Sequence, residues 1–309
     1  MIEPSCKMSV EDVATHYNDL DRYYREVWGE HLHHGLWTDG KESPEQAVQE
    51  LVRLLANQAK IGPGDQVCDV GCGYGATARQ LVDEYEAQVL GVTVSESQLE
   101  YALGQSGAPD EKLHGQARDV NSPSSSSPPA GESPNPRYRL QNWESNDFEN
   151  RSFDAVVSIE CLAHVVDKQK YFSEIFRVLK PGKHAAITAW LSGEDPTDWH
   201  VRHLLEPICR EGRLASMGTA REYEKMISAA GLELVKSESL RSHVRRTWDI
   251  CARRAVIGLF TRPEFRELLI RRSTSNWIFF VTLWRIILAY RLRVMDYGLF
   301  VIRRPVGPN

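Results

Sequence analysis

The stretch from Val67 to Gly75 constrains the fold more than any other part of the chain. It reads Val-Cys-Asp-Val-Gly-Cys-Gly-Tyr-Gly, a mainly apolar run followed by glycine at every second position. Such a run is typical of a buried strand, and closely spaced glycines allow a tight turn in which backbone approaches a ligand. The stretch therefore predicts a sheet strand whose carboxyl end carries a binding turn.

Strand-like and helix-like patterns alternate on both sides of this turn. Apolar runs predict strands at Gln66–Val70, Gln88–Val94, Arg137–Gln141, Phe153–Ile159, His184–Trp190, from Leu232 onward, and at Tyr297–Ile302. Helical periodicity predicts helices over Ser9–Trp28, after Ser43, up to Tyr85, from about Ser95, over Asp167–Lys180 with a stop at Pro181-Gly182, and over Thr219–Ala230. This alternation implies an α/β fold, a mostly parallel sheet with helices on both faces.

Two of the expected helices begin with recognisable capping signals. Ser43, Pro44 and Gln46 fit a capping box with proline at the first helical position. Thr219 and Glu222 have the spacing of a second capping box. Both signals place the start of a helix to within a residue.

The segment from about 105 to 136 has a different composition. It contains Ser-Pro-Ser-Ser-Ser-Ser-Pro-Pro and almost no large apolar side chains. Burial cannot offset the entropy of ordering such a segment, so we expect a disordered surface insertion. It is not a domain linker, because the predicted sheet needs strands from both sides of it.

Charge is distributed unevenly along the chain. From Arg241 onward fourteen basic residues face four acidic ones, whereas the whole chain carries −5. A basic C-terminal part can face a membrane surface or an anionic substrate. Basic and aromatic residues do not interleave as in a nucleic-acid module, so no nucleic-acid partner is expected.

The remaining composition indicates a cytoplasmic protein and leaves open a position peripheral to a membrane. The six cysteines are scattered and are expected to be free thiols. No secretory signal pattern is found at the N-terminus. The most apolar stretch, Trp277 to Tyr290, is interrupted by Arg285 and falls short of a bilayer span. The sequence leaves a monomer and a homodimer equally open.

The position of Asp69 narrows the ligand of the glycine turn. This acid lies at the end of the first strand, two residues before Gly71. A turn that binds pyrophosphate seldom carries a fixed anion there, because it presents N–H donors and a helix N-terminus. A ligand with sulfonium and ammonium groups suits the anion. The turn therefore favours S-adenosylmethionine over a nicotinamide dinucleotide.

Asp69, Gly71, Cys72, Gly73 and Gly75 together resemble motif I of class I S-adenosylmethionine-dependent methyltransferases. The resemblance extends over most of the chain. It implies a Rossmann-like fold with a seven-stranded, mostly parallel sheet whose last strand is antiparallel. It also implies three parts, which are an N-terminal helical lid (1–60), a cofactor-binding core (61–191) and an acceptor-binding part with a hydrophobic helical insertion and closing strands (192–309).

The second and third strand ends carry the expected ribose and adenine contacts. The segment after Gly91 is similar to that of cyclopropane fatty acid synthases and tocopherol methyltransferases. Many class I enzymes have an acid where this chain has Thr93, so the resemblance implies that Thr93 and Gln98 share the role of holding the ribose hydroxyls. Val94 is also expected to line the cofactor site. Gln98 could instead complete a capping box with Ser95. Two residues are expected beside the adenine: Asn142, and Trp143, which could also simply fill core.

The fourth strand end carries the expected catalytic residues. Ser158 to His164 resembles sterol and tocopherol methyltransferases, in which acid and imidazole positions match Glu160 and His164. The resemblance implies that Glu160 lies beside the cofactor and that both residues remove a proton or stabilise a cation. His164 could alternatively be structural and bond the lid. Cyclopropane synthases carry a glutamate before this histidine; Ala163 stands there and disfavours cyclopropanation.

The segment from Trp28 to Trp37 closely resembles one in tocopherol methyltransferases. In related families an N-terminal helix and turn fold over the cofactor, which implies that Tyr17 and His34 lie near it. Three of the segment's residues are the closely spaced histidines His31, His33 and His34. No nearby acid or cysteine has ligand spacing, so no metal is expected.

The acceptor side is expected in two segments, Leu191–Met217 and His243–Arg293. The second is rich in aromatic and aliphatic residues with arginines between them, and could be core, an acceptor tunnel or a membrane-facing patch. We expect methyl transfer to a small, largely hydrophobic acceptor that is isoprenoid, sterol-like or aromatic, with C-methylation favoured. The alternatives are an N- or O-methyltransferase of an amine or natural product, and a cofactor-binding relative without methyl transfer.

Overall fold

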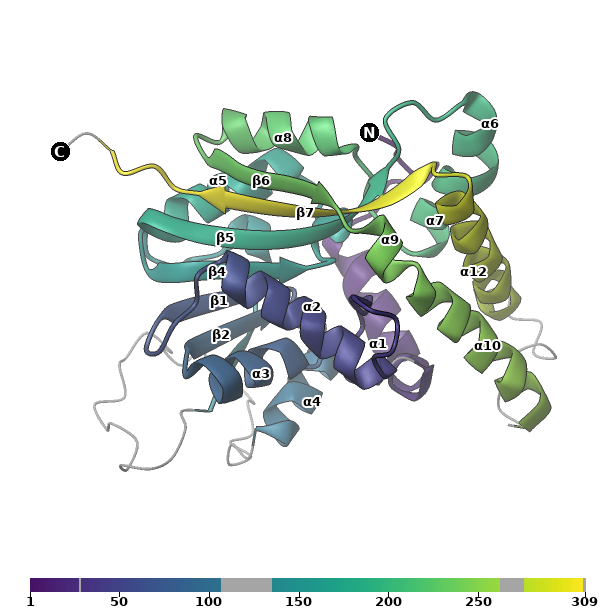
Figure 1. The fold of residues 1–309 in the computed structure, drawn as a ribbon, viewed down its shortest axis with the longest axis horizontal. Helices are drawn as coiled ribbons and strands as arrows, with labels where there is room; N and C mark the ends of the chain where they lie inside the picture. Colours follow the sequence, from purple (N-terminus) through teal and green to yellow (C-terminus); the bar gives the residue numbers. More distant parts are fainter. Residues whose placement is uncertain (28, 107–134, 262–274, 308–309) are drawn as a thin grey trace.

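The computed structural model describes residues 1–27, 29–106, 135–261 and 275–307, and its centre is one sheet of seven strands (Figure 1). The strands lie in the order β3-β2-β1-β4-β5-β7-β6. Their bounds are β1 Gln66–Val70, β2 Gln88–Thr93, β3 Arg137–Leu140, β4 Phe153–Ile159, β5 Leu179–Ser192, β6 Glu233–Ser239 and β7 Met295–Arg303. Strands β1 to β5 pair in parallel, and β7 runs antiparallel to both β5 and β6. The expected seven-stranded, mostly parallel sheet with an antiparallel last strand is confirmed; β7 lies inside the sheet and β6 at its edge.

Helices cover both faces of the sheet because the strands are apolar on both sides. Val67 of β1 belongs to a core shared with α2 and α3, whereas its neighbour Cys68 packs in the core formed with α5 and α8. Successive side chains point to opposite faces of a strand, so one short run serves both cores. The helices are α1 Val10–Val27, α2 Pro44–Gln58, α3 Ala76–Tyr85, α4 Glu96–Gln105, α5 Lys168–Val178, α6 Asp198–His200, α7 Glu206–Glu211, α8 Ala220–Ala229, α9 Arg241–Val244, α10 Arg246–Thr261 and α12 Ser275–Arg291.

Both predicted capping boxes are present. The Ser43 side chain accepts from the Gln46 amide while Gln46 returns a bond to the Ser43 backbone, and Thr219 and Glu222 do the same for α8. The predicted stop at Pro181-Gly182 is wrong. Helix α5 ends at Val178, and the dipeptide lies inside β5, where the pairing with β4 shifts register. Proline and glycine occur at irregular positions of strands as well as at helix ends.

Several helices from distant parts of the chain gather at the carboxyl ends of the parallel strands, at the right of Figure 1. Helix α12 packs against both α10 and α7, and α1 packs against α4 and α10. No helix in the described ranges is long and apolar enough to cross a bilayer. The expected insertion at about 105–136 falls almost wholly within 107–134, outside the described residues. This end of the sheet carries the site.

Candidate active site

The glycine turn forms as the sequence predicts and leaves open space above it. Gly71 has φ +78°, and a Cβ there would lie 2.6 Å from the Cβ of Cys161, so no side chain fits. Gly73 has φ +54°, and a Cβ there would meet no atom within 4 Å. The amides of Gly71 and Cys72 both donate to the Val92 carbonyl, which ties the turn to β2. The turn is thus a fixed floor with room for a ligand.

Asp69 supplies a buried acceptor beside this floor. Its side chain is 2% exposed, and its Oδ2 has no hydrogen-bond partner. Burial raises the pKa of Asp69 to about 7, because the charged form loses its hydration. A buried polar atom without a partner is rare in a folded protein unless a ligand completes it. The ammonium and hydroxyl donors of S-adenosylmethionine fit this acceptor.

The ribose-side residues bond to each other. The Thr93 hydroxyl donates to Gln98 Oε1 at 2.7 Å, and both side chains are 5% exposed. Ser95 caps α4 by accepting from the Gln98 amide, but the Gln98 side chain turns to Thr93 and completes no capping box. The alternative that Gln98 only caps this helix is therefore wrong. Asn18 of α1 bonds to Ser95, which fixes the N-terminal helix over this edge.

The two residues expected beside the adenine, Asn142 and Trp143, both line the cavity described below. Asn142 Oδ1 accepts from the Glu144 amide at 3.0 Å and begins the short helix Trp143–Ser145. Trp143 is 4% exposed, and its indole donates to the Tyr171 carbonyl. Trp143 thus belongs to the core as well as lining the cavity described below.

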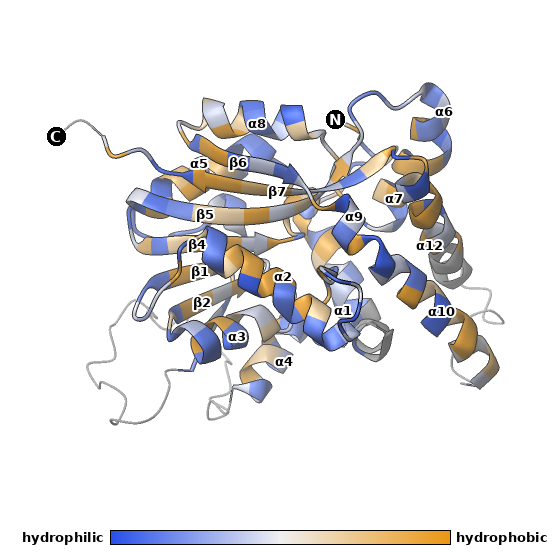
Figure 2. Cartoon of the chain, viewed as in Figure 1, coloured by the Kyte–Doolittle hydropathy of each residue, from blue (hydrophilic) through white to orange (hydrophobic). Residues whose placement is uncertain are grey.

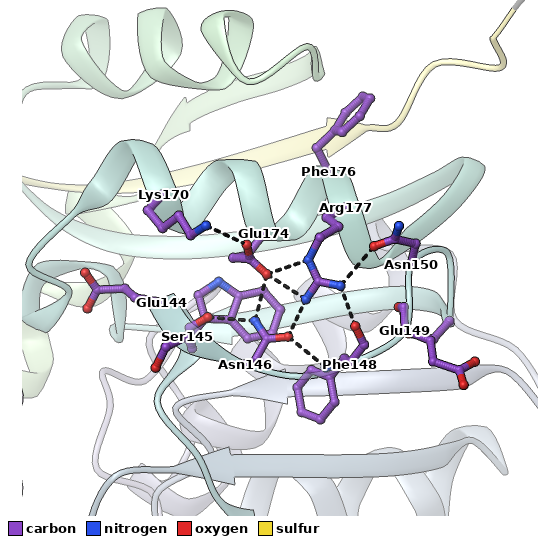
Figure 3. Close-up of polar contacts among 12 residues, drawn as sticks. Glu144, Ser145, Asn146, Phe148, Glu149, Asn150, Lys170, Glu174, Phe176 and Arg177 are labelled. Carbon is purple, nitrogen blue, oxygen red and sulfur yellow. Dashed lines mark hydrogen bonds and ion pairs between the residues drawn. The ribbon is translucent and has the colours of Figure 1, made fainter. Parts of the chain in front are cut away.

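A polar network holds this adenine-side loop in place (Figure 3). Arg177 donates to Glu174 at 2.8 Å and to Asn146 at 2.6 Å, and it also bonds to the Phe148 carbonyl. Asn146 in turn donates to the Trp143 carbonyl at 2.7 Å and to Glu174 at 3.0 Å. Glu174 is buried, and its carboxylate is compensated by these donors. Helix α5 therefore fixes residues 143–150 through one arginine and one glutamate.

Glu160 follows β4 with the positive φ of 59° and receives four donors. The amide and Nδ1 of His34 donate to it at 2.7 and 2.8 Å, Trp190 Nε1 at 2.7 Å, and the Tyr297 hydroxyl at 2.9 Å. Burial favours the neutral acid, but interaction with His34 outweighs it and lowers the pKa of Glu160. Trp248 also packs on His34, with ring centroids 5.1 Å apart. Glu160 is thus a carboxylate held among aromatic rings, which we call the aromatic corner (His34, Glu160, Trp190, Trp248 and Tyr297).

His164 is a neutral imidazole with a defined tautomer. Its Nδ1 lies 3.1 Å from the Arg213 carbonyl oxygen and must donate to it, which leaves Nε2 as the acceptor. The Tyr17 hydroxyl donates to Nε2 at 3.0 Å. Burial lowers the pKa of His164 to about 4. His164 thus contacts the N-terminal helix, and it lines the cavity as a neutral ring whose Nε2 is a hydrogen-bond acceptor.

The two other closely spaced histidines, His31 and His33, form successive hydrogen bonds that lead to His34. His33 donates through Nδ1 to the His34 carbonyl at 2.8 Å, so its Nε2 accepts from Nδ1 of His31 at 3.0 Å. Within the described residues, no three His, Cys, Asp or Glu side chains are grouped as a metal site. This chain of imidazoles fixes the turn that presents His34 to Glu160.

A single cavity of about 520 Å³ joins these groups. Nearly all the predicted site residues line it: Tyr17, His34, Asp69, Gly71, Cys72, Gly73, Thr93, Val94, Gln98, Asn142, Trp143, Glu160 and His164. Gly75 does not line it; it is the N-cap of α3 and lies against Tyr138. The volume is within the range of small-molecule sites.

The other wall of the cavity comes from the two predicted acceptor segments. Its apolar side chains are Ile208, Leu214, Trp248, Leu283 and Ile286. Sequence reasoning missed several polar or aromatic members of the lining, namely His16, Trp190, Arg213 and Thr247. None of them lies at a strand end that a motif marks, so nothing in the sequence singled them out. The cavity thus has a polar floor on the sheet and a largely apolar roof.

Comparison with known proteins agrees with this geometry. Residues 68–187 match the family model of the methyltransferase domain, and residues 5–117 and 130–257 match that of mycolic acid cyclopropane synthetase. The chloroplastic tocopherol O-methyltransferase of Arabidopsis thaliana is 23% identical over 95% of this chain and 82% of its own. The 24-methylenesterol C-methyltransferase 3 of the same plant is 26% identical over 76% of this chain and 60% of its own.

A solved structure shares the fold. The cyclopropane synthase MmaA2 from Mycobacterium tuberculosis superposes with a TM-score of 0.76 at 21% identity, over 97% of this chain and 99% of that one. The second family model covers well over half of this chain, and its matched ranges contain the glycine turn and most of the cavity lining. The chain therefore belongs to the mycolic acid cyclopropane synthetase family, and it is a class I methyltransferase whose cofactor is S-adenosylmethionine.

Proposed function

We propose that the enzyme methylates a small, largely hydrophobic acceptor of isoprenoid, sterol-like or aromatic type, with carbon as the favoured nucleophile. The observation that carries this proposal is the continuous cavity, in which the donor floor at Asp69 and Gly73 faces an apolar roof from α7, α10 and α12. A roof of this kind excludes water and aligns an apolar acceptor over the floor. The names of the tocopherol and sterol relatives point to acceptors of the same character.

The residues of the floor are proposed to hold the cofactor. Asp69 accepts from its ammonium or hydroxyl groups, Thr93, Val94 and Gln98 bound the ribose, and Asn142 with Trp143 bounds the adenine. Tyr17 and His34 close the site from the N-terminal part (1–60), residues 61–191 form the core, and residues 192–309 supply the acceptor walls. When bound, S-adenosylmethionine supplies a methyl group on a positively charged sulfur.

The aromatic corner favours reaction at carbon. Attack by an alkene or ring carbon leaves positive charge on the acceptor. A fixed carboxylate in an aromatic surrounding stabilises such charge. Glu160 is ionised and fully bonded, so its proposed role is electrostatic. His164 Nε2 is an unprotonated acceptor on the same cavity and is proposed to take the proton that the acceptor loses. Ala163, in place of an acid, argues against cyclopropanation.

A second candidate is O-methylation of a natural product, which the same imidazole supports. The Nε2 acceptor of His164 can take the proton of a hydroxyl that attacks the methyl group, as well as the proton that a methylated carbon loses. An amine acceptor or a relative without methyl transfer remains the weaker alternative, because the aromatic corner and apolar roof would then have no task.

The test is transfer of labelled methyl from S-adenosylmethionine into a panel of prenyl, sterol, phenolic and amine acceptors, with the products identified by mass spectrometry. We expect C-methylated apolar products. Glu160→Gln should lower kcat by about 100-fold, the size typical of one lost electrostatic stabiliser, with little change in cofactor affinity. Glu160→Asp should retain part of the rate. Glu45→Gln, an exposed glutamate on α2, is the matched control. Transfer to amines alone would refute the proposal.

We also propose that the basic C-terminal part contacts a membrane surface. Helix α12 exposes Trp284 and Leu288, and α10 exposes Val256, Ile257 and Phe260. Apolar residues continue along α10 to the end farthest from the sheet (Figure 2). Apolar side chains on a helix flanked by arginines suit an anionic lipid interface. The opposite side of α12 lines the cavity, so this surface adjoins the acceptor site.

A further inference from the structure

One corner of the cavity collects basic side chains from three separate segments. His16 and Tyr17 come from α1, His164 from the turn after β4, and Arg213 from the residues following α7, and all four line the cavity. The Tyr17 and His164 rings meet edge to face with centroids 5.5 Å apart. Burial is the main cause that lowers the pKa of the half-buried His16 to about 4, and the charges of His164 and Arg213 add to it. Both histidines are therefore neutral, and the positive charge of this corner comes from Arg213.

Arg213 places a positively charged guanidinium in this corner of the cavity. It is half-buried, and among the described residues its guanidinium makes no hydrogen bond or ion pair. Its neighbour Arg210, which also lines the cavity, is bonded to Glu206 and lies 3.5 Å from Glu211. Hydrogen bonds with Ser9 are the main cause that lowers the pKa of Asp12, an exposed residue at the start of α1, and the charge of Arg213 adds to it. Arg213 is thus a charge available to a ligand.

The backbone of Arg213 fixes which ligand groups fit beside it. Arg213 has the positive φ of 54°, and its carbonyl takes the Nδ1 proton of His164. His164 can therefore only accept a hydrogen bond through Nε2. A carboxylate or phosphate oxygen has no proton to donate at neutral pH and would face the lone pair of Nε2. The matching ligand group carries a proton for Nε2 and becomes an anion beside Arg213.

We propose that the acceptor is a phenol whose hydroxyl binds between Nε2 of His164 and the guanidinium of Arg213. This inference rests on the proposed function and names its acceptor class. The phenol proton moves to Nε2 of His164, and the resulting phenolate pairs with Arg213. The phenolate makes the ring electron-rich, so either its oxygen or a ring carbon can attack a methyl group.

The structure already places one phenol on Nε2 of His164. The Tyr17 hydroxyl donates to this atom at 3.0 Å, which is the first of the two contacts proposed for the acceptor hydroxyl. Tyr17 belongs to the N-terminal helix, so an acceptor that displaces its hydroxyl would also displace the side chain of the lid. An aliphatic alcohol fits less well, because a neutral imidazole beside one guanidinium removes a proton far more readily from a phenol than from an alcohol.

Binding of a chromogenic phenol tests the proposed contacts with His164 and Arg213 and requires no methyl transfer. The probe is a 2-alkyl-4-nitrophenol, whose phenolate absorbs visible light, titrated against the protein saturated with S-adenosylhomocysteine. In the wild type we expect the bound probe to ionise at least about one pH unit below the free probe, as for an acid beside a cation. Arg213→Gln should abolish this shift, Arg213→Lys should retain most of it, and Arg221→Gln, a 74%-exposed arginine on α8, should leave it unchanged.

Other groups act on His164, so the titration includes variants that separate them. Lys168 opposes and Glu160 favours its protonation, and both remain in place in the Arg213 variants. In His164→Gln, Arg213 alone should still lower the pH at which the bound probe ionises, whereas methyl transfer should be lost. A bound probe that ionises at its free pH, an Arg213→Gln protein that matches wild type, or a probe that does not bind would each overturn the proposal.

The acceptor panel distinguishes the two levels of proposal. Methylation of prenyl or sterol compounds that does not depend on Arg213 would support the proposed function and contradict the phenol assignment. Failure to methylate any apolar acceptor would sink the proposed function itself. Support for both would be phenol methylation whose kcat/KM falls about 10- to 100-fold in Arg213→Gln, the cost of one charge-assisted bond.

Discussion

At the scale of single residues, Asp69 combines a cost in stability with its proposed role in cofactor binding. Its pKa is raised to about 7, so the folded protein holds this proton more tightly than the unfolded chain does. A raised pKa means that stability falls as the pH rises from about 4 to 7, and the loss is complete above that window. The buried anion thus weakens the free enzyme at neutral pH and is available to the donors of the cofactor.

We predict opposite effects of Asp69→Asn on these two properties. At pH 8 the variant should unfold a few degrees higher than wild type when no ligand is present, because it no longer buries a charge. Its affinity for S-adenosylhomocysteine should fall by about 10- to 100-fold, since a charged acceptor is lost. Differential scanning calorimetry and isothermal titration measure the two effects. Unchanged affinity would contradict the role given to Asp69.

Three half-buried histidines predict a loss of stability in mild acid. Burial is the largest cause that lowers the pKa values of His16 and His164 to about 4 and that of His31 to about 3. Below pH 6.5 the unfolded chain takes up protons that the folded protein refuses, so stability falls as the pH drops from 6.5 toward 4. The cost is on the order of 1 to 2 kcal/mol per histidine at pH 5. Urea midpoints at pH 7 and pH 5 measure it, and equal midpoints would contradict it.

At the scale of elements, the adenine-side loop depends on α5. Arg177→Met should release residues 143–150, because Arg177 bonds to Asn146, to the Phe148 carbonyl and to Glu174. It also leaves the buried Glu174 without its main cation, a loss of about 3 kcal/mol for a buried pair. We expect lower thermal stability and a cofactor Kd raised about 10-fold, with kcat at saturation nearly preserved.

A matched variant separates the effect of losing the bonds to the loop from the effect of losing a cation beside Glu174. Lys170→Met removes the other cation of Glu174, but Lys170 is 49% exposed and makes no recorded bond to the loop. It should leave cofactor affinity unchanged and cost less than about 1 kcal/mol. Equal effects of the two substitutions on Kd would show that the network does not position the loop.

Elements bounded by strong local signals could be predicted closely from the sequence. Strands β1 and β4 match their expected bounds at both ends, because each is an apolar run set off by polar or glycine residues. The start of β5 could not be predicted in this way. A Pro-Gly pair such as Pro181-Gly182 is found both at helix ends and where the pairing of two strands shifts register. Tertiary pairing decided between the two.

The same division holds for the site. Asp69 and Thr93 lie at the ends of parallel strands, and Asn142 and Glu160 follow such strands; because the carboxyl ends of parallel strands meet at one edge, their convergence was predictable. Trp190 ends a predicted strand, so its place at this edge was predictable as well. The positions of Arg213, Thr247 and Tyr297 depend on how later segments pack over that edge, which no local pattern records. The hydrogen bond between Gln98 and Thr93 likewise depends on the fold, because the local spacing of Gln98 equally allowed a capping box.

At the scale of the whole molecule, the cavity and the exposed apolar surface share their helices. Leu283 and Ile286 of α12 face the cavity, while Trp284, 61% exposed, and Leu288 lie on its outer side. Phe260 at the end of α10 is 80% exposed. Such exposure of large apolar groups costs solubility unless the surface meets another apolar phase. An acceptor dissolved in lipid would then enter beside the helices that form the roof.

Vesicle co-sedimentation measures this contact. We predict that the wild-type protein pellets with vesicles of anionic phospholipid at low salt, and less so at high salt because arginine attraction is screened. Trp284→Asp should lower the bound fraction several-fold, since it removes apolar area and adds a charge that the lipid repels. Trp199→Asp is the control, because Trp199 on α6 is 54% exposed but belongs to neither helix of the apolar surface. Equal losses in the two variants would mean that α10 and α12 are not the membrane-facing surface, and absence of wild-type binding would mean that the acceptor reaches the cavity through water.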